Sequence, residues 1–316
     1  MIRTVQFSRK TKEAIAGYLF LMPNFIGFLV FTSIPILASL LLAFTDYNIL
    51  QPELTEFIGI DNFIRLFQDT EFWYYCYNTI FLMLAIPISV FGSLGLALIL
   101  NRSLRGIIFY RTIYFLPTIS SGVAIYVLWR WMYNPDFGLL NTAIRNFGDL
   151  VHINFQGIPW LTDPRWAKPA LIIMGVWQTV GGHNMILYLA ALQGVPYSLY
   201  EAADIDGANS WQKFWNITWP MISPTTFFIV IMSIIGGFQS GFDSAYIMTG
   251  GGPYTKIIGG AGPYGSTKTI MFYIYDNAFG AIRDMGYAAA ISWVLFVIIF
   301  AFTLLNWKTG GKRVHY

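Results

Sequence analysis

Long runs without a charged residue divide this chain and predict its elements. Six of them lie at 14–45, 72–101, 112–129, 169–200, 214–242 and 285–307. A hydrocarbon core of ~30 Å needs about 20 helical residues at ~1.5 Å each. The pattern therefore predicts an all-α integral membrane protein with six transmembrane helices, at 17–44, 78–100, 110–132, 169–192, 221–240 and 286–307.

The composition excludes a soluble globular protein. Of the 316 residues, 56% are apolar and only 11% are charged, whereas a typical soluble domain has about 25% charged residues. Too few charged side chains are left to cover a globule. The first apolar run is also too long for the core of a cleaved signal peptide, so we expect it to persist as a helix.

The distribution of Lys and Arg predicts the orientation. With the N-terminus inside, the cytoplasmic segments carry 11 basic and four acidic residues, and the outer segments carry eight basic and 12 acidic residues. The positive-inside rule then places both termini in the cytoplasm. We expect a cytoplasmic N-terminal segment at 1–16, a transmembrane domain at 17–308 and a cytoplasmic tail at 309–316.

The cytoplasmic segment 196–220 differs from a short connector. Pro196 suits a helix start, and 200–206 is compatible with a short helix that ends at Gly207. Ser210 is suited to cap a second turn. Acidic residues on the side where basic ones are expected suggest a partner with basic charge.

The spacing within this segment resembles the EAA loop of ABC-importer permeases. Trp219 stands where that family usually has Leu, and the rest of the spacing is intact. The stretch 191–196 resembles the run that normally precedes this loop, and the stretches 242–253, 274–279 and 286–290 are similar to the sugar (carbohydrate uptake) branch. The residues that carry the EAA match are Glu201, Ala202, Ala203, Gly207, Ile217 and Pro220.

This resemblance implies a permease subunit with the type I importer fold in the bacterial cytoplasmic (inner) membrane. It implies a second permease subunit, which we expect to be a different chain, and two cytoplasmic ATPase subunits that bind ATP and Mg²⁺. It also implies an extracytoplasmic solute-binding protein, for which the outer segments 45–77, 133–167 and 241–284 are the expected docking surface. The segment 196–220 would then be the coupling loop that contacts an ATPase.

The resemblance also assigns roles within the coupling loop. Glu201 would pair with a basic group of the ATPase, and the two alanines after it would allow close approach. Gly207 would make the turn, and the aromatic residues after it would supply apolar contact area. An amphipathic helix lying on anionic lipid headgroups is the alternative, which acidic residues fit poorly. The coupling residues are Glu201, Ala202, Ala203, Asp206, Gly207, Trp211, Phe214 and Pro220.

The chain lacks the residues for its own energy supply or catalysis. No G-x-x-x-x-G-K-[ST] motif is present, and the predicted helix interiors contain no Asp or Glu. One cysteine and three dispersed histidines offer no metal site, and a net charge of +3 does not suggest nucleic acid. We therefore expect a transporter subunit in contact with membrane lipid, neither an enzyme nor a cofactor protein. The alternatives are an ATP-independent secondary carrier or channel, and a membrane-embedded enzyme.

Polar and aromatic residues near mid-membrane mark a candidate substrate pathway. They are Gln178, His183, Asn184, Phe238 and Gln239. A lone histidine in an apolar helix more often bonds a neighbouring helix than a ligand. The expected solute is a sugar or oligosaccharide, with a glycerol-phosphate-like polyol as the alternative. An outer stretch, 252–256, is echoed at 262–268 and has no assigned role.

Overall fold

The computed structural model describes residues 8–102, 105–153, 157–249, 265–281 and 283–310. These residues form helices and loops, with two isolated β-bridges and no strand among them. The chain divides into two compact units, Met1–Gln68 with Asn277–Trp293, and Asp69–Asp276 with Val294–Tyr316. The echoed stretch at 252–256 and the first three residues of its repeat lie outside the described residues.

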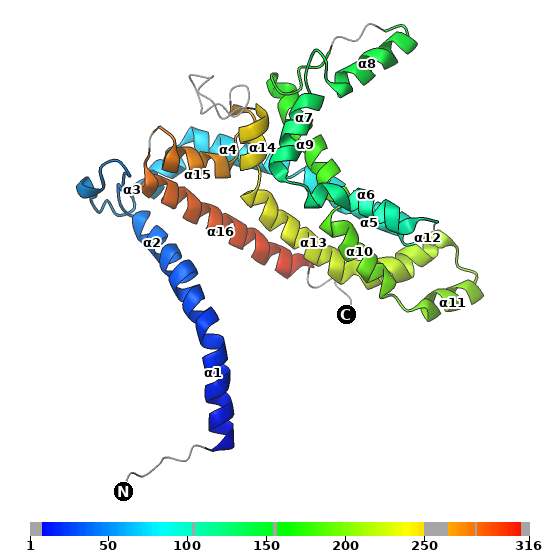
Figure 1. Cartoon of the computed structure of the whole chain (residues 1–316), viewed down its shortest axis with the longest axis horizontal. Helices are drawn as coiled ribbons and strands as arrows, with labels where there is room; N and C mark the ends of the chain where they lie inside the picture. The colour runs from blue at the N-terminus through cyan, green and yellow to red at the C-terminus, as the bar shows by residue number, and fades with distance from the viewer. Residues whose placement is uncertain (1–7, 103–104, 154–156, 250–264, 282, 311–316) are drawn as a thin grey trace. The chain divides into compact units, whose positions relative to one another are not determined.

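The first unit begins with one long helical run, which Figure 1 draws in blue. It consists of α1 (Arg9–Phe28), a π-helix (Leu29–Ser33) and α2 (Ile34–Leu42). Pro35 cannot donate to the carbonyl of Phe31, and its ring needs space there, which the wider π turn provides. The run starts well before the predicted residue 17, because the Ser8 side chain accepts a hydrogen bond from the backbone N–H of Thr11 and caps the helix.

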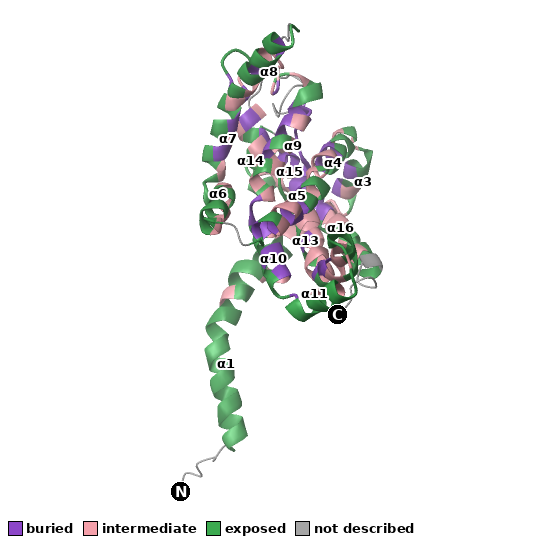
Figure 2. Ribbon diagram, turned by 90° about the vertical axis from the view of Figure 1, so that its right-hand side faces the viewer, coloured by how far each residue is buried: buried purple, intermediate pink, exposed green. Residues whose placement is uncertain are grey.

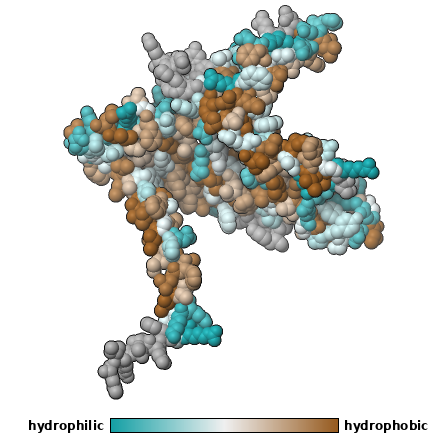
Figure 3. All heavy atoms as spheres, in the orientation of Figure 1, coloured by the Kyte–Doolittle hydropathy of each residue, from teal (hydrophilic) through white to brown (hydrophobic). Residues whose placement is uncertain are grey.

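This run is apolar and exposed. Neither α1 nor α2 contains a buried residue, and Figure 2 draws α1 almost entirely in the green of exposed residues. Its surface is brown along most of its length in Figure 3 and polar at the first turns, where Arg9, Lys10 and Glu13 lie. An apolar helix without buried residues is what a lipid environment or another subunit would cover.

The rest of the first unit contains η2 (Pro52–Leu54), α3 (Asp61–Gln68) and the start of α16 (Met285–Gly310). The buried Asn62 amide donates to the carbonyls of Ala43 and Thr45, at 3.1 and 2.8 Å. The Arg65 guanidinium pairs with Asp284 at 2.7 Å. These polar contacts hold α3 against its own unit.

The second unit is a helical bundle built around α5. The helix α5 packs against α9, α10 and α13, and the apolar core between them includes Leu94, Met185, Leu189 and Ile229. The helices that begin in this unit are α4 (Thr70–Leu82), α5 (Ala85–Leu100), α6 (Ile107–Ile119), α7 (Gly122–Met132), α8 (Leu139–Leu150), α9 (Pro164–Val180), α10 (His183–Gln193), α11 (Tyr197–Ile205), α12 (Ser210–Lys213), the π-helix η3 (Phe214–Thr218), α13 (Trp219–Gln239), α14 (Phe242–Thr249) and α15 (Ile270–Phe279).

Among the described residues, five helical runs are long and apolar enough to cross a membrane. They are Arg9–Leu42, Thr70–Leu100, Pro164–Gln193, Ser210–Gln239 and Met285–Lys308. Each contains most of one predicted helix, and most extend further than predicted because capping residues lie beyond the charge-free runs.

The prediction of one continuous helix at 110–132 is wrong. This stretch consists of α6 and α7, which meet at an angle of 97°. At the break, Ser120 adopts an extended conformation, and its hydroxyl donates to the Leu116 carbonyl at 2.9 Å. Serine competes in this way with the backbone for the helix hydrogen bonds. The count is six spans only if the bent pair crosses as one.

Candidate functional sites: an internal cavity and the 196–220 loop

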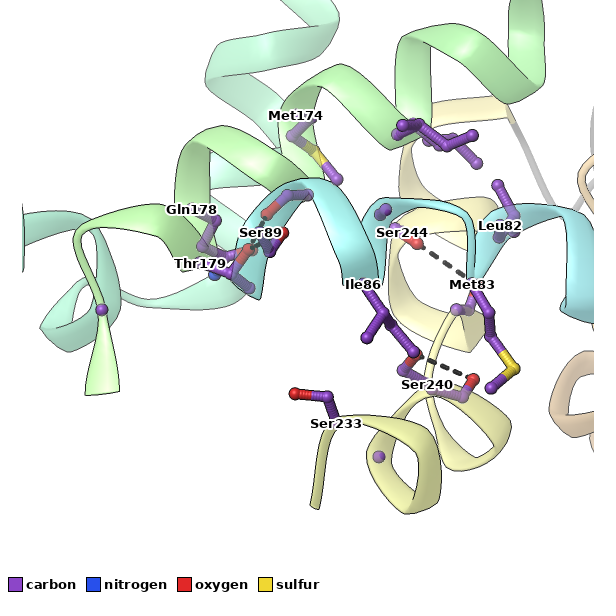
Figure 4. Close-up of a pocket in the computed structure, with 18 of the residues that line it drawn as sticks. Leu82, Met83, Ile86, Ser89, Met174, Gln178, Thr179, Ser233, Ser240 and Ser244 are labelled. Carbon is purple, nitrogen blue, oxygen red and sulfur yellow. Dashed lines mark hydrogen bonds between the residues drawn. The ribbon is translucent and has the colours of Figure 1, made fainter. Parts of the chain in front are cut away.

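A cavity of about 570 Å³ lies within the second unit. Residues from α4, α5, α6, α7, α9, α10, α13 and α14 line it, and Figure 4 shows part of this wall. None of the lining residues among the described positions is Asp, Glu, Lys or Arg. The polar side chains of the wall are those of Thr79, Ser89, Thr118, Tyr126, Gln178, Thr179, His183, Asn184, Ser233, Ser240, Ser244 and Thr269.

Hydroxyl groups dominate this polar wall. The hydroxyls of Thr179 and Ser89 lie 2.7 Å apart and share a hydrogen bond between α9 and α5. The Ser240 hydroxyl donates to the carbonyl of Gly237 at 3.2 Å. The Thr118 hydroxyl oxygen is buried and has no hydrogen-bond partner among the described residues. The wall therefore combines apolar surface with hydroxyls able to donate and accept.

Glycines bring the backbones around the cavity close together. A Cβ atom at Gly182 would lie 2.7 Å from the Thr118 hydroxyl oxygen, and one at Gly237 would lie 3.0 Å from Met83 Cγ. A side chain at either position would enter space that neighbouring residues occupy. Both positions therefore allow the helices to approach closely.

Three of the five predicted pathway residues line the cavity. They are Gln178 near the end of α9, and His183 and Asn184 at the start of α10. The His183 ring is exposed and lies edge-to-face with Phe115, with 5.8 Å between ring centroids. No side-chain hydrogen bond from His183 to a neighbouring helix occurs in the part of the chain that the structure describes.

Phe238 and Gln239 are not among the lining residues. Phe238 is buried and packs on Phe302, with ring centroids 5.4 Å apart, while Gln239 is exposed. An α-helix turns by about 100° per residue. The face of α13 that brings Ser233, Gly236 and Gly237 to the cavity therefore turns Phe238 and Gln239 away from it.

Sequence reasoning missed the hydroxyl residues of the wall. Ser89, Thr179, Ser233 and Ser240 lie within the charge-free runs, where the pattern gave them no role, and Ser244 lies just beyond one of them. The available signal was the spacing of Ser233 and Ser240, seven residues apart on one helix face.

Two buried lysines of this unit do not line the cavity. The Lys168 ammonium lies 4.5 Å from the Tyr77 ring centroid and 5.1 Å from that of Phe81. Lys268 is paired with Asp276. The aromatic faces stabilise the Lys168 ammonium by cation–π contacts, and the Asp276 carboxylate pairs with Lys268. Neither lysine therefore supplies a cation to the cavity wall.

The 196–220 loop folds as predicted around Gly207. The helix α11 begins after Pro196 and ends at the C-cap Asp206. Gly207 follows at φ +75°, where its N–H donates to the Asp204 carbonyl at 3.1 Å. The Ala208 N–H donates to the Ala203 carbonyl at 2.8 Å. These two bonds form a Schellman motif, which requires a left-handed residue and so favours glycine.

The cap of the second turn is Asn209 rather than Ser210. The Asn209 side chain accepts from the Gln212 N–H at 2.9 Å, and the Gln212 side chain accepts from the Asn209 N–H at 2.8 Å. This is a capping box, in which two free helix donors are satisfied reciprocally. Ser210, the expected cap, is the first residue of α12.

The loop exposes both charge and apolar surface. Glu201, Ala202, Asp206 and Gly207 are exposed, and Ala203 is half-buried. Trp211 is 70% exposed, and its ring lies 5.6 Å from that of Trp215. The other aromatic and proline residues of the predicted set, Phe214 and Pro220, are half-buried.

Several known proteins are similar to this chain in sequence or structure. The sequence model of the family described as "Binding-protein-dependent transport system inner membrane component" matches residues 74–307. The chain is 38% identical to the probable ABC transporter permease protein YesP of Bacillus subtilis (strain 168), over 96% of this chain and 93% of that protein. It is 37% identical to the lactose transport system permease protein LacF of Rhizobium radiobacter, over 99% of this chain and 100% of that protein.

A solved structure is similar over most of the chain. It is that of a bacterial ABC transporter involved in the import of the acidic polysaccharide alginate. The TM-score is 0.79 at 27% identity, and the match covers 96% of this chain and 98% of that one. The likeness therefore extends over the described helices of both units.

Proposed function

Because the chain belongs to the family of binding-protein-dependent transport system inner membrane components, we propose that it is the permease subunit of an ATP-driven importer for a sugar or oligosaccharide. The observation that carries the solute class is the cavity wall, which offers many hydroxyl and amide groups and no fixed charge. Polyhydroxylated solutes are recognised through such neutral hydrogen-bonding groups.

The proposed topology has six spans, with α6 and α7 counted as one. Both termini lie in the cytoplasm of a bacterial cell, and the protein resides in the inner membrane. Residues 1–16 and 309–316 are the terminal cytoplasmic segments, and 17–308 form the permease domain. The excess of Lys and Arg in the proposed inner segments supports this orientation.

The proposed assembly contains a second, different permease subunit, two ATPase subunits and an extracytoplasmic binding protein. ATP and Mg²⁺ bind to the ATPases. The exposed residues of the 196–220 loop form the contact with one ATPase, with Glu201 as its charged group and Trp211 as an apolar anchor. An exposed, structured loop with this pattern also supports an ATP-driven system over an ATP-independent carrier.

Transport proceeds by alternating access. Closure of the ATPases moves the 196–220 loop, and the bundle changes between inward-facing and outward-facing states around the cavity. Gln178 and Asn184 hold the solute by hydrogen bonds, while the apolar part of the wall contacts its carbon faces.

An uncharged solute fits the wall better than a phosphorylated polyol. A phosphate at this depth would need a cationic partner, because a buried unpaired charge is costly. Lys168 and Lys268 are each engaged outside the lining. The second candidate, a glycerol-phosphate-like polyol, therefore lacks a cationic partner among the described residues that line the cavity.

Uptake into proteoliposomes tests the proposal. The chain would be reconstituted with its co-purified permease, ATPases and binding protein, and uptake of radiolabelled lactose and of glycerol 3-phosphate would be measured. We expect ATP-dependent uptake of the neutral sugar only. A chain that purifies alone and moves solute without ATP would contradict the importer.

Two glutamines of the same chain provide a matched comparison. Gln178→Ala removes an amide from the cavity wall, whereas Gln239→Ala removes one that does not line it. We expect the first to lower uptake at least fivefold and the second to leave it unchanged. Equal effects of the two substitutions would count against this cavity as the solute site.

A further inference from the structure

A partly buried hydrogen bond joins α11 to the helix that enters the bundle. The hydroxyl oxygens of Tyr200 and Thr218 lie 2.8 Å apart, and Thr218 is only 5% exposed. We propose that Tyr200 and Thr218 are positioning residues that transmit movement of the 196–220 loop to α13. This inference rests on the proposed importer function and adds the residues that connect its two sites.

Either hydroxyl can donate in this bond. The Thr218 hydroxyl also lies 3.4 Å from the carbonyl of Lys213, five residues earlier, to which it can donate. The Lys213 carbonyl lies at the wider π turn of η3, where the helix is underwound and a side-chain hydroxyl has room to reach it.

The hydrogen bond is set within apolar packing. Tyr200 and Ile217 both pack against the core cluster of the bundle, which includes Leu100, Leu192 and Ile222. Burial keeps water from replacing the bond between the hydroxyls and makes it stronger than an exposed one.

A second link between the same elements is solvent-exposed. Lys213 pairs with Asp204, whose side chain is 62% exposed. Exposed ion pairs contribute little to stability and are screened by salt. Two side-chain links join α11 to the 210–218 segment in the described structure. The Tyr200–Thr218 bond is therefore the one that keeps α11 in position relative to this segment.

Movement at Thr218 reaches the cavity along a continuous helix. The π-helix η3 runs directly into α13, which carries Ser233, Gly236 and Ser240 to the cavity wall. The path covers 15 to 22 residues, roughly 23–33 Å at ~1.5 Å per residue. A helix is stiff over this length, so displacement of its start displaces the wall.

The test uses the complete importer with its binding protein in proteoliposomes, and lactose as the probe solute. The measured quantity is solute imported per ATP hydrolysed. Tyr200→Phe removes one hydroxyl of the pair and keeps the ring, and Thr218→Val removes the other hydroxyl and keeps the shape. We expect both variants to assemble and hydrolyse ATP within twofold of wild type, while solute per ATP falls at least fivefold.

Two further variants separate transmission from folding. Thr218→Ser retains the hydroxyl and should keep the wild-type ratio. Thr303→Val makes the same side-chain change at a control position. In the described structure the Thr303 hydroxyl donates to the Ile299 carbonyl of its own helix, at 2.8 Å. This variant should also keep the wild-type ratio of solute to ATP.

The outcomes distinguish this inference from the proposed function. A wild-type ratio in Tyr200→Phe and Thr218→Val would overturn the inference, and so would an equal fall in Thr303→Val. If Thr218→Val does not assemble, Tyr200→Phe decides alone. A wild-type assembly that shows no link between ATP hydrolysis and lactose uptake would instead contradict the proposed importer of neutral sugars.

Discussion

The hydroxyls of Thr179 and Ser89, 2.7 Å apart, join α9 to α5 at the wall of the cavity. Ser93 adds a second contact by donating to the Thr179 carbonyl at 3.4 Å. A Cβ atom at Gly92 would lie only 2.9 Å from a Val180 methyl carbon, so the absence of a side chain at Gly92 makes room for Val180 of α9. Small residues and hydroxyls of this kind replace the hydrophobic effect as the source of helix association in a bilayer.

Removing either hydroxyl should weaken this helix pair. Ser89→Ala and Thr179→Val, alone and combined, should give a coupling free energy of about 0.6 kcal/mol, the usual value for hydrogen bonds between membrane helices. The measurement is unfolding of the purified protein by denaturing detergent, analysed as a double-mutant cycle. Ser292→Ala serves as the control, because that hydroxyl bonds only within its own helix. A coupling of zero would show that the two hydroxyls act independently.

Gly181 should tolerate no side chain. A Cβ atom there would lie 2.2 Å from the carbonyl oxygen of Tyr114 in α6, a backbone atom that cannot turn away. Gly181→Ala should therefore destabilise the fold by about 1–3 kcal/mol, as overpacking does. The measurement is the fraction that remains monodisperse on size exclusion after heating.

A second glycine provides the control for Gly181. A Cβ atom at Gly95 in α5 would meet nothing within 4 Å. Gly95→Ala should be neutral or stabilise by about 0.5–1 kcal/mol, because alanine favours a helix interior. Equal losses at the two positions would mean that the contact with Tyr114 does not govern the effect.

Gly207 should accept Asn better than Val. Its φ of +75° lies in the left-handed region, which costs an ordinary L-residue about 1–2 kcal/mol and which Asn visits most readily. Gly207→Val should distort the loop and reduce co-purification of the ATPase severalfold, while Gly207→Asn should retain most of it. Equal recovery with both variants would argue against a role for this turn in the contact.

The pair of Lys268 and Asp276 should matter far more than a surface pair. Lys268 is 2% exposed and also lies 5.1 Å from the Tyr75 ring centroid. Lys268→Met should lower stability by about 3 kcal/mol, because Asp276 would lose its partner. Arg9→Gln, which breaks an exposed pair with Glu13, should change stability by less than about 0.5 kcal/mol. Thermal unfolding of the purified protein measures the stability of both variants. Similar losses of stability would show that the buried pair matters no more than the exposed one.

The sequence predicted the helical class and the turn of the loop because both depend on local signals. Charge-free runs locate apolar helices, and Gly207 at its fixed distance from Glu201 locates the left-handed turn. The choice between Asn209 and Ser210 as cap could not be made, because both residue types favour that position and the capping box with Gln212 decides it.

The break at Ser120 and the cavity wall depend on tertiary structure. A hydropathy profile does not reveal the bend between α6 and α7, because the residues on both sides of it are apolar. Phe238 and Gln239 were expected in the pathway from their depth, but the rotation of α13 decides which residues face the cavity. The amphipathic helix α8 lies outside the apolar runs and was missed, although Leu140 and Ile144 pack on an apolar core at helical spacing.

The uncharged wall of the cavity also bears on the electrical side of transport. Each elementary charge that crosses a potential of 100 mV changes the free energy by about 2.3 kcal/mol. A neutral solute passing neutral hydroxyl and amide groups carries no such contribution. Uptake of a neutral sugar would then be electrically silent, and the voltage across the membrane would neither assist nor oppose accumulation. A cell with a collapsed membrane potential would continue to import as long as ATP remained.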